Sequence, residues 1–200
     1  MLSAPLEALA AAFGVVFLAE LGDKTQLMVL AFATRFQAMP VVLGVVAASA
    51  VVMGASVLVG AAVGSFVEVA LLQLVGGVVF LLFAAWTLLG REERAEDIEA
   101  LARYKARPRS GLRAAAIVTG TFVLAELGDK SMLAALTLAT QAEPVATWAG
   151  ATLGLVGVSL IAVVVGRQLG ERVPRRLLRY VAAGAFAVFG LLLLWEGLGS

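Results

Sequence analysis

The chain has neither cysteine nor histidine among its 200 residues. Disulfide bonds, thiolate nucleophiles and imidazole sites are therefore excluded. A bound metal ion would have to be held by oxygen atoms, with methionine sulfur as a weak addition. That donor set favours Ca²⁺, Mn²⁺ or Mg²⁺ over Zn²⁺ and copper. Proton transfer would depend on carboxylates or lysine.

Charge is also scarce, since only 14% of the residues are charged while 62% are hydrophobic, and the mean hydropathy is +1.00. Soluble domains contain about 45–50% apolar residues. The excess indicates apolar surface that faces lipid as well as protein. The length accommodates about six membrane-spanning helices of roughly 20 residues each. We therefore predict an all-α, polytopic membrane protein.

Apolar stretches predict six transmembrane helices. The expected spans are Leu6–Thr34, Val41–Ala62, Val69–Leu89, Leu112–Thr140, Val145–Val165 and Leu177–Leu194. The first and the fourth are too long for one straight crossing. Each contains a Gly-Asp pair near its middle, at Gly22-Asp23 and at Gly128-Asp129, where we expect the helix to break.

Basic residues are confined to one set of alternate loops. Thirteen of the 15 bases lie at Arg35 and in the segments Arg91–Arg113 and Arg167–Arg179. The positive-inside rule makes this side cytoplasmic. We therefore expect both termini outside, in a bacterial inner membrane. The outer loops and tails carry only acids: Glu7, Glu68, Glu143 and Glu196. An acidic vestibule that raises the local cation concentration is one interpretation, and we favour the other, four solvated interface residues.

A seven-residue motif occurs twice. Ala-Glu-Leu-Gly-Asp-Lys-Thr at Ala19–Thr25 returns as Ala-Glu-Leu-Gly-Asp-Lys-Ser at Ala125–Ser131, 106 positions later. The same offset aligns Gly44 with Gly150, so three spans are duplicated. Because three is odd, the two halves enter the membrane in opposite directions, as in the inverted repeats of many secondary transporters. The predicted units are a first three-helix repeat (1–90), a cytoplasmic linker (91–111) and a second three-helix repeat (112–200).

The motif places ionisable groups where each costs about 2.5–3.5 kcal/mol. Glu20 and Asp23 share a helix face if the turn is helical, whereas unwinding at Gly22 would free backbone carbonyls as further ligands. Two copies meeting at the repeat interface would supply four carboxylates, which suits a hard divalent cation. The candidate metal ligands are Glu20, Asp23, Thr25, Gln26, Glu126, Asp129 and Ser131.

The motif lysines, Lys24 and Lys130, argue against a cage made of acids alone. They can neutralise the carboxylates of the empty site, extend away from it, or take part in proton coupling. The structural alternative is an ion-pair cluster that fixes helix packing. Buried ion pairs stabilise little relative to apolar replacements, and duplication in opposite orientations disfavours this alternative further.

The two motifs, set in two three-span halves around a charged central segment, resemble the Gdt family of cation/proton exchangers, whose signature Glu-x-Gly-Asp-Lys/Arg-Thr/Ser occurs twice. The resemblance covers essentially the whole chain. It implies exchange of Mn²⁺ or Ca²⁺ for H⁺, with no resident cofactor. It also implies that the ion is bound by Glu20, Asp23, Glu126 and Asp129, supported by Thr25, Gln26 and Ser131.

We therefore predict a secondary transporter that exports Mn²⁺ or Ca²⁺ from the cytoplasm in exchange for H⁺. Its expected partners are the divalent ion and membrane lipid, with no nucleic acid. Two alternatives stay open: an exporter of a cationic amino acid, whose ammonium group the acids would bind, and a non-transporting membrane scaffold. An enzyme is disfavoured because the sequence offers no nucleophile–base pair.

Overall fold

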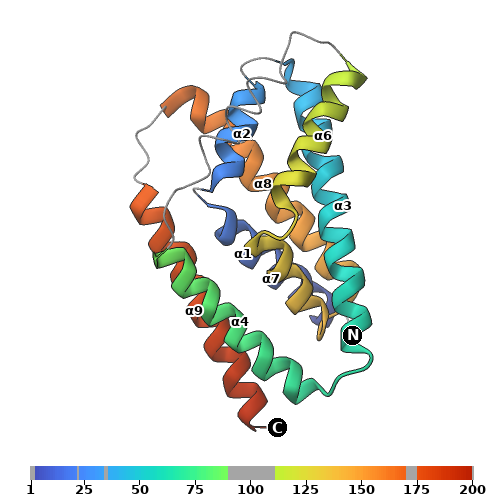
Figure 1. Cartoon of the computed structure of the whole chain (residues 1–200), viewed down its shortest axis with the longest axis vertical. Coiled ribbons are helices and arrows are strands. Elements are labelled where there is room, and N and C mark those ends of the chain that lie inside the picture. The colour runs from blue at the N-terminus through green and yellow to red at the C-terminus, as the bar shows by residue number, and fades with distance from the viewer. Residues whose placement is uncertain (1–2, 22, 34–35, 90–110, 170–174, 200) are drawn as a thin grey trace.

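The computed structural model of the chain describes residues 3–21, 23–33, 36–89, 111–169 and 175–199. These residues form helices and short connections without a β-strand, which confirms the all-α prediction (Figure 1). The predicted linker, apart from Gly111, lies outside the described residues. The helices are α1 (Ser3–Glu20), α2 (Lys24–Ala33), α3 (Ala38–Gly64), α4 (Val69–Leu89), α6 (Leu112–Glu126), α7 (Lys130–Ala139), α8 (Pro144–Leu169) and α9 (Arg175–Gly199).

Both helix breaks occur where the Gly-Asp pairs predict them. Helix α1 ends at Glu20, and α6 ends at the equivalent Glu126. In the second break Gly128 has a φ of 76°, a conformation that glycine adopts easily and other residues rarely adopt. Asp129 then takes an extended conformation as the N-cap of α7. The motif therefore ends one helix and starts another within three residues.

Within the described residues, five helices are long and apolar enough to cross a membrane by length and composition. The count of six spans is not reproduced, because the break divides the predicted fourth span into α6, with 15 residues, and α7, with 10. Neither piece is long enough to qualify by itself. The five candidate spans are Ser3–Glu20, Ala38–Gly64, Val69–Leu89, Pro144–Ile161 and Tyr180–Gly199.

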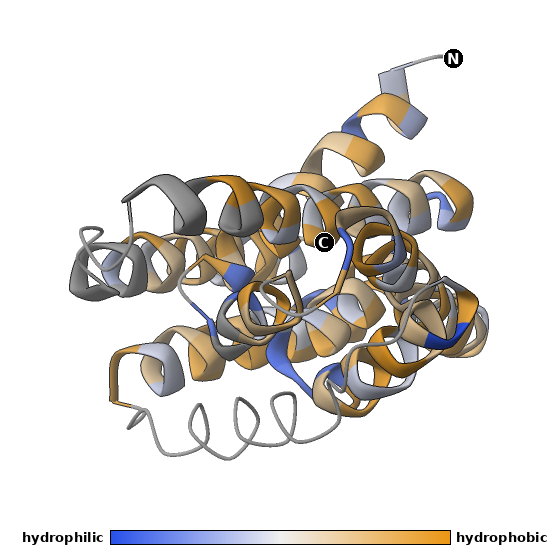
Figure 2. Ribbon diagram, turned by 90° about the horizontal axis from the view of Figure 1, so that it is seen from above, coloured by the Kyte–Doolittle hydropathy of each residue, from blue (hydrophilic) through white to orange (hydrophobic). Residues whose placement is uncertain are grey.

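Large apolar side chains cover much of the outer surface. Phe66, Leu89 and Trp195 are each more than 80% exposed, and Leu58 is 74% exposed. Hydrophobic ribbon likewise lies on every side of the helix assembly when it is seen from above (Figure 2). A water-soluble monomer rarely exposes so much contiguous apolar surface. The protein is therefore a membrane protein, with this surface against lipid.

Equivalent helices of the two halves make equivalent contacts. Helix α1 packs along α8, and α6 packs along α3, while α4 and α9 lie side by side (Figure 1). A Cβ atom on Gly150 of α8 would collide with the carbonyl oxygen of Leu9, and one on Gly44 of α3 would collide with the carbonyl oxygen of Ala115. Leu9 and Ala115 are separated by the same 106 positions as the two glycines. The long helix that follows each break, α3 or α8, thus packs against the helix that precedes the break in the other half, α6 or α1.

Substitution of Gly150 by alanine is expected to destabilise the protein, because the added methyl group meets backbone that cannot move aside. Overpacking of this kind costs about 1–3 kcal/mol. Gly14 on α1 provides the control, since no atom of another described segment lies within 4 Å of the position of its Cβ. Thermal unfolding in detergent should show a lower Tm for Gly150→Ala and little change for Gly14→Ala. Equal Tm values for the two variants would mean that the helix contact is looser than described.

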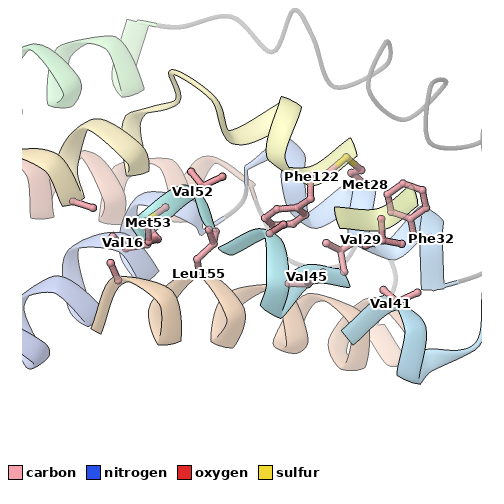
Figure 3. Close-up of a cluster of buried hydrophobic side chains, with 14 of the residues drawn as sticks. Val16, Met28, Val29, Phe32, Val41, Val45, Val52, Met53, Phe122 and Leu155 are labelled. Atoms are coloured by element: carbon pink, nitrogen blue, oxygen red, sulfur yellow. The ribbon is translucent and has the colours of Figure 1, made fainter. Parts of the chain in front are cut away.

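The main hydrophobic core joins both halves around the breaks. Val16 of α1, Phe32 of α2, Val45 of α3, Phe122 of α6 and Leu155 of α8 are all buried in it (Figure 3). A second cluster links α4 and α9 through edge-to-face and tilted rings, with centroids 5.7–6.3 Å apart: Phe80, Phe83, Phe186 and Phe189. These two cores hold the broken helices in the interior of the molecule.

Four exposed acids lie in connections and terminal helix turns. The N- and C-termini lie at the same end, together with the α3–α4 and α7–α8 connections (Figure 1). The four acids expected in outer loops, Glu7, Glu68, Glu143 and Glu196, are all exposed. Glu143 also caps α8, because its carboxylate accepts hydrogen bonds from the N–H groups of Val145 (3.1 Å) and Ala146 (2.5 Å). At least one of these acids therefore has a structural role.

Candidate metal-ion site

Carboxylates from the two motifs meet between the broken helices. One oxygen atom each of Glu20, Asp23 and Asp129 lies within 4.8 Å of the others. Glu20 has no exposed surface, and the two aspartates are partly buried. We call these three residues the carboxylate triad. The expectation that the two motifs come together is confirmed for its members, because Asp129 belongs to the second motif.

Glu126 is not a member of the triad, although the duplication predicts a ligand there. It ends α6, has no exposed surface and experiences the negative charges of Glu20, Asp23 and Asp129. Its Oε2 accepts a hydrogen bond from the hydroxyl of Ser131 at 3.0 Å. The first motif repeats this arrangement, since Glu20 Oε2 accepts a 2.7 Å hydrogen bond from Thr25. The two predicted hydroxyl ligands thus orient the two glutamates.

Several buried carboxylate oxygens have no donor within the described part of the chain. They are Glu20 Oε1, Asp23 Oδ2 and Glu126 Oε1. A buried polar atom without a partner costs about 1–3 kcal/mol, so such atoms require an explanation. The hydroxyl of Thr25 or Ser131 donates to one oxygen of each glutamate and leaves the other oxygen available. Oxygen atoms from both motifs are therefore free to bind a cation or to carry a proton.

A lysine connects the two motifs directly. Lys130, the first residue of α7, places Nζ at 3.1 Å from Asp23 Oδ1. The side chains of Lys130 and Asp23 are 18% and 20% exposed. Of the roles considered for the motif lysines, neutralisation of a carboxylate fits Lys130, which pairs with Asp23 of the other motif. The side chain of Lys24 lies outside the described residues.

The residue after each motif supports the break rather than the triad. Gln26, predicted as an amide ligand, donates its Nε2–H to the carbonyl oxygen of Glu20 at 3.0 Å. Its counterpart Met132 accepts a 3.3 Å hydrogen bond from the N–H of Gly128 through sulfur. Carbonyl groups at a helix end lack intrahelical partners, so a polar side chain one turn later is well placed to satisfy one. That spacing is the sequence signal for the role of Gln26.

The short helices that follow the breaks, α2 and α7, stabilise negative charge at their first residues. Helices α2 and α7 begin directly after Asp23 and Asp129. The first N–H groups of a helix lack intrahelical acceptors and carry partial positive charge, which stabilises nearby carboxylates. The backbone turns are the same in both copies: Asp23 N–H donates to Glu20 O at 3.1 Å and Asp129 N–H to Glu126 O at 3.0 Å. The site thus concentrates negative charge and free oxygens in a largely apolar surrounding.

Comparison with known proteins gives a consistent family. The family model described as "Divalent cation/proton antiporter GDT1" matches residues 8–95 and 114–200. A Vibrio cholerae protein named "Putative manganese exporter" is 29% identical over 189 residues, covering 93% of this chain and 90% of its own. A GDT1-like protein of Synechocystis is 28% identical over 202 residues, covering 95% of this chain and 98% of its own.

A plant relative is similar over only part of its own length. The chloroplastic protein PAM71 of Arabidopsis thaliana is 30% identical over 202 residues, which cover 90% of this chain and 54% of the plant protein. No solved structure matches the chain. The family model covers both motif copies and most of the chain, and the motif acids it spans form the site described above. The chain belongs to the GDT1 family of divalent cation/proton antiporters.

Proposed function

We propose that the protein exports Mn²⁺ or Ca²⁺ from the cytoplasm in exchange for H⁺. The carboxylate triad carries this proposal, because it brings oxygens of both motifs within 4.8 Å of one another in a membrane protein. Carboxylates and other oxygen ligands suit these ions. A carboxylate must lose its proton to bind a metal, so metal and proton compete for the same atoms. That competition couples the two fluxes.

In this proposal the triad binds the ion first, and Glu126 adds a fourth carboxylate charge. Thr25 and Ser131 orient the two glutamates through the hydrogen bonds described above and can add hydroxyl oxygens when the ion binds. Gln26 can add its amide oxygen while its nitrogen contacts the break. Ca²⁺ takes about six to eight oxygen ligands, so carbonyl groups at the breaks or water would supply the rest. The full set is Glu20, Asp23, Thr25, Gln26, Glu126, Asp129 and Ser131.

We also propose six crossings arranged as two inverted three-helix repeats. The α1–α2 and α6–α7 pairs each form one broken crossing, with the motif near the membrane centre. The reciprocal contacts of Gly44 and Gly150 support this repeat. Broken helices whose ends face the cargo are typical of inverted-repeat transporters.

The orientation of the chain gives a direct test of the six crossings. We expect the C-terminus outside the cytoplasm, in a bacterial plasma membrane, because the bases lie in one set of loops. A reporter that is active only in the periplasm should give a signal when fused after Ser200. The same reporter inserted into the 91–110 segment should be silent. A silent C-terminal fusion, with a signal from the inserted one, would require the opposite orientation.

Ion flux in proteoliposomes tests the function itself. The purified chain, reconstituted with a pH-sensitive dye inside, should move protons when Mn²⁺ or Ca²⁺ is added outside. Lysine should give no signal. Proton movement driven by lysine would instead favour the cationic amino acid exporter, since the acids would then bind an ammonium group. Absence of flux with every cation would favour the scaffold.

A further inference from the structure

The ammonium group of Lys130 stands in a position that its own helix disfavours. Lys130 is the first residue of α7, where the helix end already carries partial positive charge. Its side chain is mostly buried and reaches across to Asp23 in the other motif. The positive charge of Lys130 is balanced first by Asp23, which accepts its hydrogen bond, and then by the nearby charges of Glu20 and Asp129.

The oxygens that hold Lys130 belong to the proposed cargo site. Asp23 Oδ1 contacts Nζ at 3.1 Å, while Asp23 Oδ2 is buried without a donor in the described part of the chain. A cation bound by the triad would lie within a few ångströms of Nζ. Repulsion between two cations at that distance is strong in a low-dielectric interior. Lys130 and the cargo therefore cannot both remain on Asp23.

We propose that Lys130 is a tethered competitor of the transported ion. The inference rests on the proposed function. The ammonium group occupies Asp23 when the site is empty, moves away when a divalent ion binds, and returns as the ion leaves. A tethered competitor weakens binding and speeds release. It also favours divalent cargo, because a monovalent ion would only replace one positive charge by another.

A packing role for the same ion pair makes the opposite prediction for one variant. If Lys130 and Asp23 only held α2 and α7 together, loss of either member would loosen the site and weaken metal binding. If Lys130 competes with the ion, its loss strengthens metal binding, whereas loss of Asp23 removes a ligand and weakens it. The sign of the change in affinity therefore separates the two roles.

The test is calorimetric titration of Mn²⁺ into the full chain in detergent. Lys130→Gln and Lys130→Met are expected to lower the Kd by about tenfold or more, because a charge within a few ångströms is removed. Lys130→Arg keeps the charge and should stay within roughly threefold of the wild type. Asp23→Asn should raise the Kd by about tenfold or more. In proteoliposomes Lys130→Gln should lower both the KM for Mn²⁺ and the maximal rate, because release becomes slower.

The outcomes distinguish this inference from the proposed function. Unchanged or weaker Mn²⁺ binding by both neutral Lys130 variants, with a wild type that binds Mn²⁺, overturns the competitor and leaves the function intact. Neutral variants that both fail to fold, while Lys130→Arg folds, overturn it in favour of packing. A wild type that binds neither Mn²⁺ nor Ca²⁺ overturns the proposed function, and the competitor with it.

Discussion

Glutamine in place of Glu20 is expected to lower Mn²⁺-driven proton flux by about 100-fold or more, and Glu126→Gln should do the same. Leaving a buried charge uncompensated costs about 3–5 kcal/mol, which corresponds to at least that factor. Glutamine keeps the shape of the side chain and one oxygen for Thr25 or Ser131. It then places an NH₂ group where the free oxygen stood, and it can neither exchange a proton nor balance the metal charge.

The measurement is flux in proteoliposomes with a pH dye inside, together with proton release on Mn²⁺ binding in detergent. Glu68→Gln is the matched control, because Glu68 is exposed at the opposite end of α4 from the predicted linker. It is a cleaner control than Glu143, whose carboxylate caps α8. Wild-type flux in Glu126→Gln alone would restrict the site to the triad. Wild-type flux in both variants would contradict carboxylate exchange.

Valine in place of Gly128 is expected to lower the flux by roughly tenfold or more while leaving the protein folded. The φ of 76° at this position costs L-residues about 1–2 kcal/mol, and a β-branched residue tolerates it least. The break would relax toward ordinary helix or extended geometry, and Asp129 would leave the triad. A steric clash is not the cause, since no other atom of the described residues lies within 4 Å of the Cβ position, apart from the adjoining residues.

Gly120→Val supplies the control for this experiment. Gly120 lies in α6, the helix that ends two residues before Gly128. It also has open space at its Cβ position within the described part of the chain, and it does not have a positive φ. It should retain most of the flux and most of the Mn²⁺ affinity. Equal flux in the two variants would mean that the second motif functions without the left-handed turn at Gly128.

The sequence predicts the helix breaks because local chemistry determines them. In both copies the first helix ends at the motif glutamate and the next begins directly after the motif aspartate, so the Gly-Asp pair falls in the break. The meeting of the two motifs also follows, because equal depth in duplicated, oppositely directed halves leads to one interface. These predictions require no knowledge of how the helices are rotated about their axes.

The sequence could not predict the features that depend on how each helix is rotated about its axis. Glu126 has the same motif position as Glu20, yet it is not a member of the triad. Lys130 pairs with Asp23 of the other copy, a contact between residues 107 positions apart that no local pattern predicts. The contacts at Gly44 and Gly150 determine how closely the halves approach, and their backbone partners are not visible in a hydropathy pattern.

The crossed packing of the halves also constrains the order in which the chain can fold during synthesis. Helix α1 is made first, but its partner α8 follows after more than half of the chain has been synthesised. Until then α1 lies in the membrane without its final neighbour, and the close contact between the Leu9 backbone and Gly150 cannot form. Non-local contacts of this kind slow folding, because the intervening loop must close first. If the two halves were expressed separately, each would lack the helix against which its first helix packs. Each half would then complete its packing only by associating with the other in the bilayer.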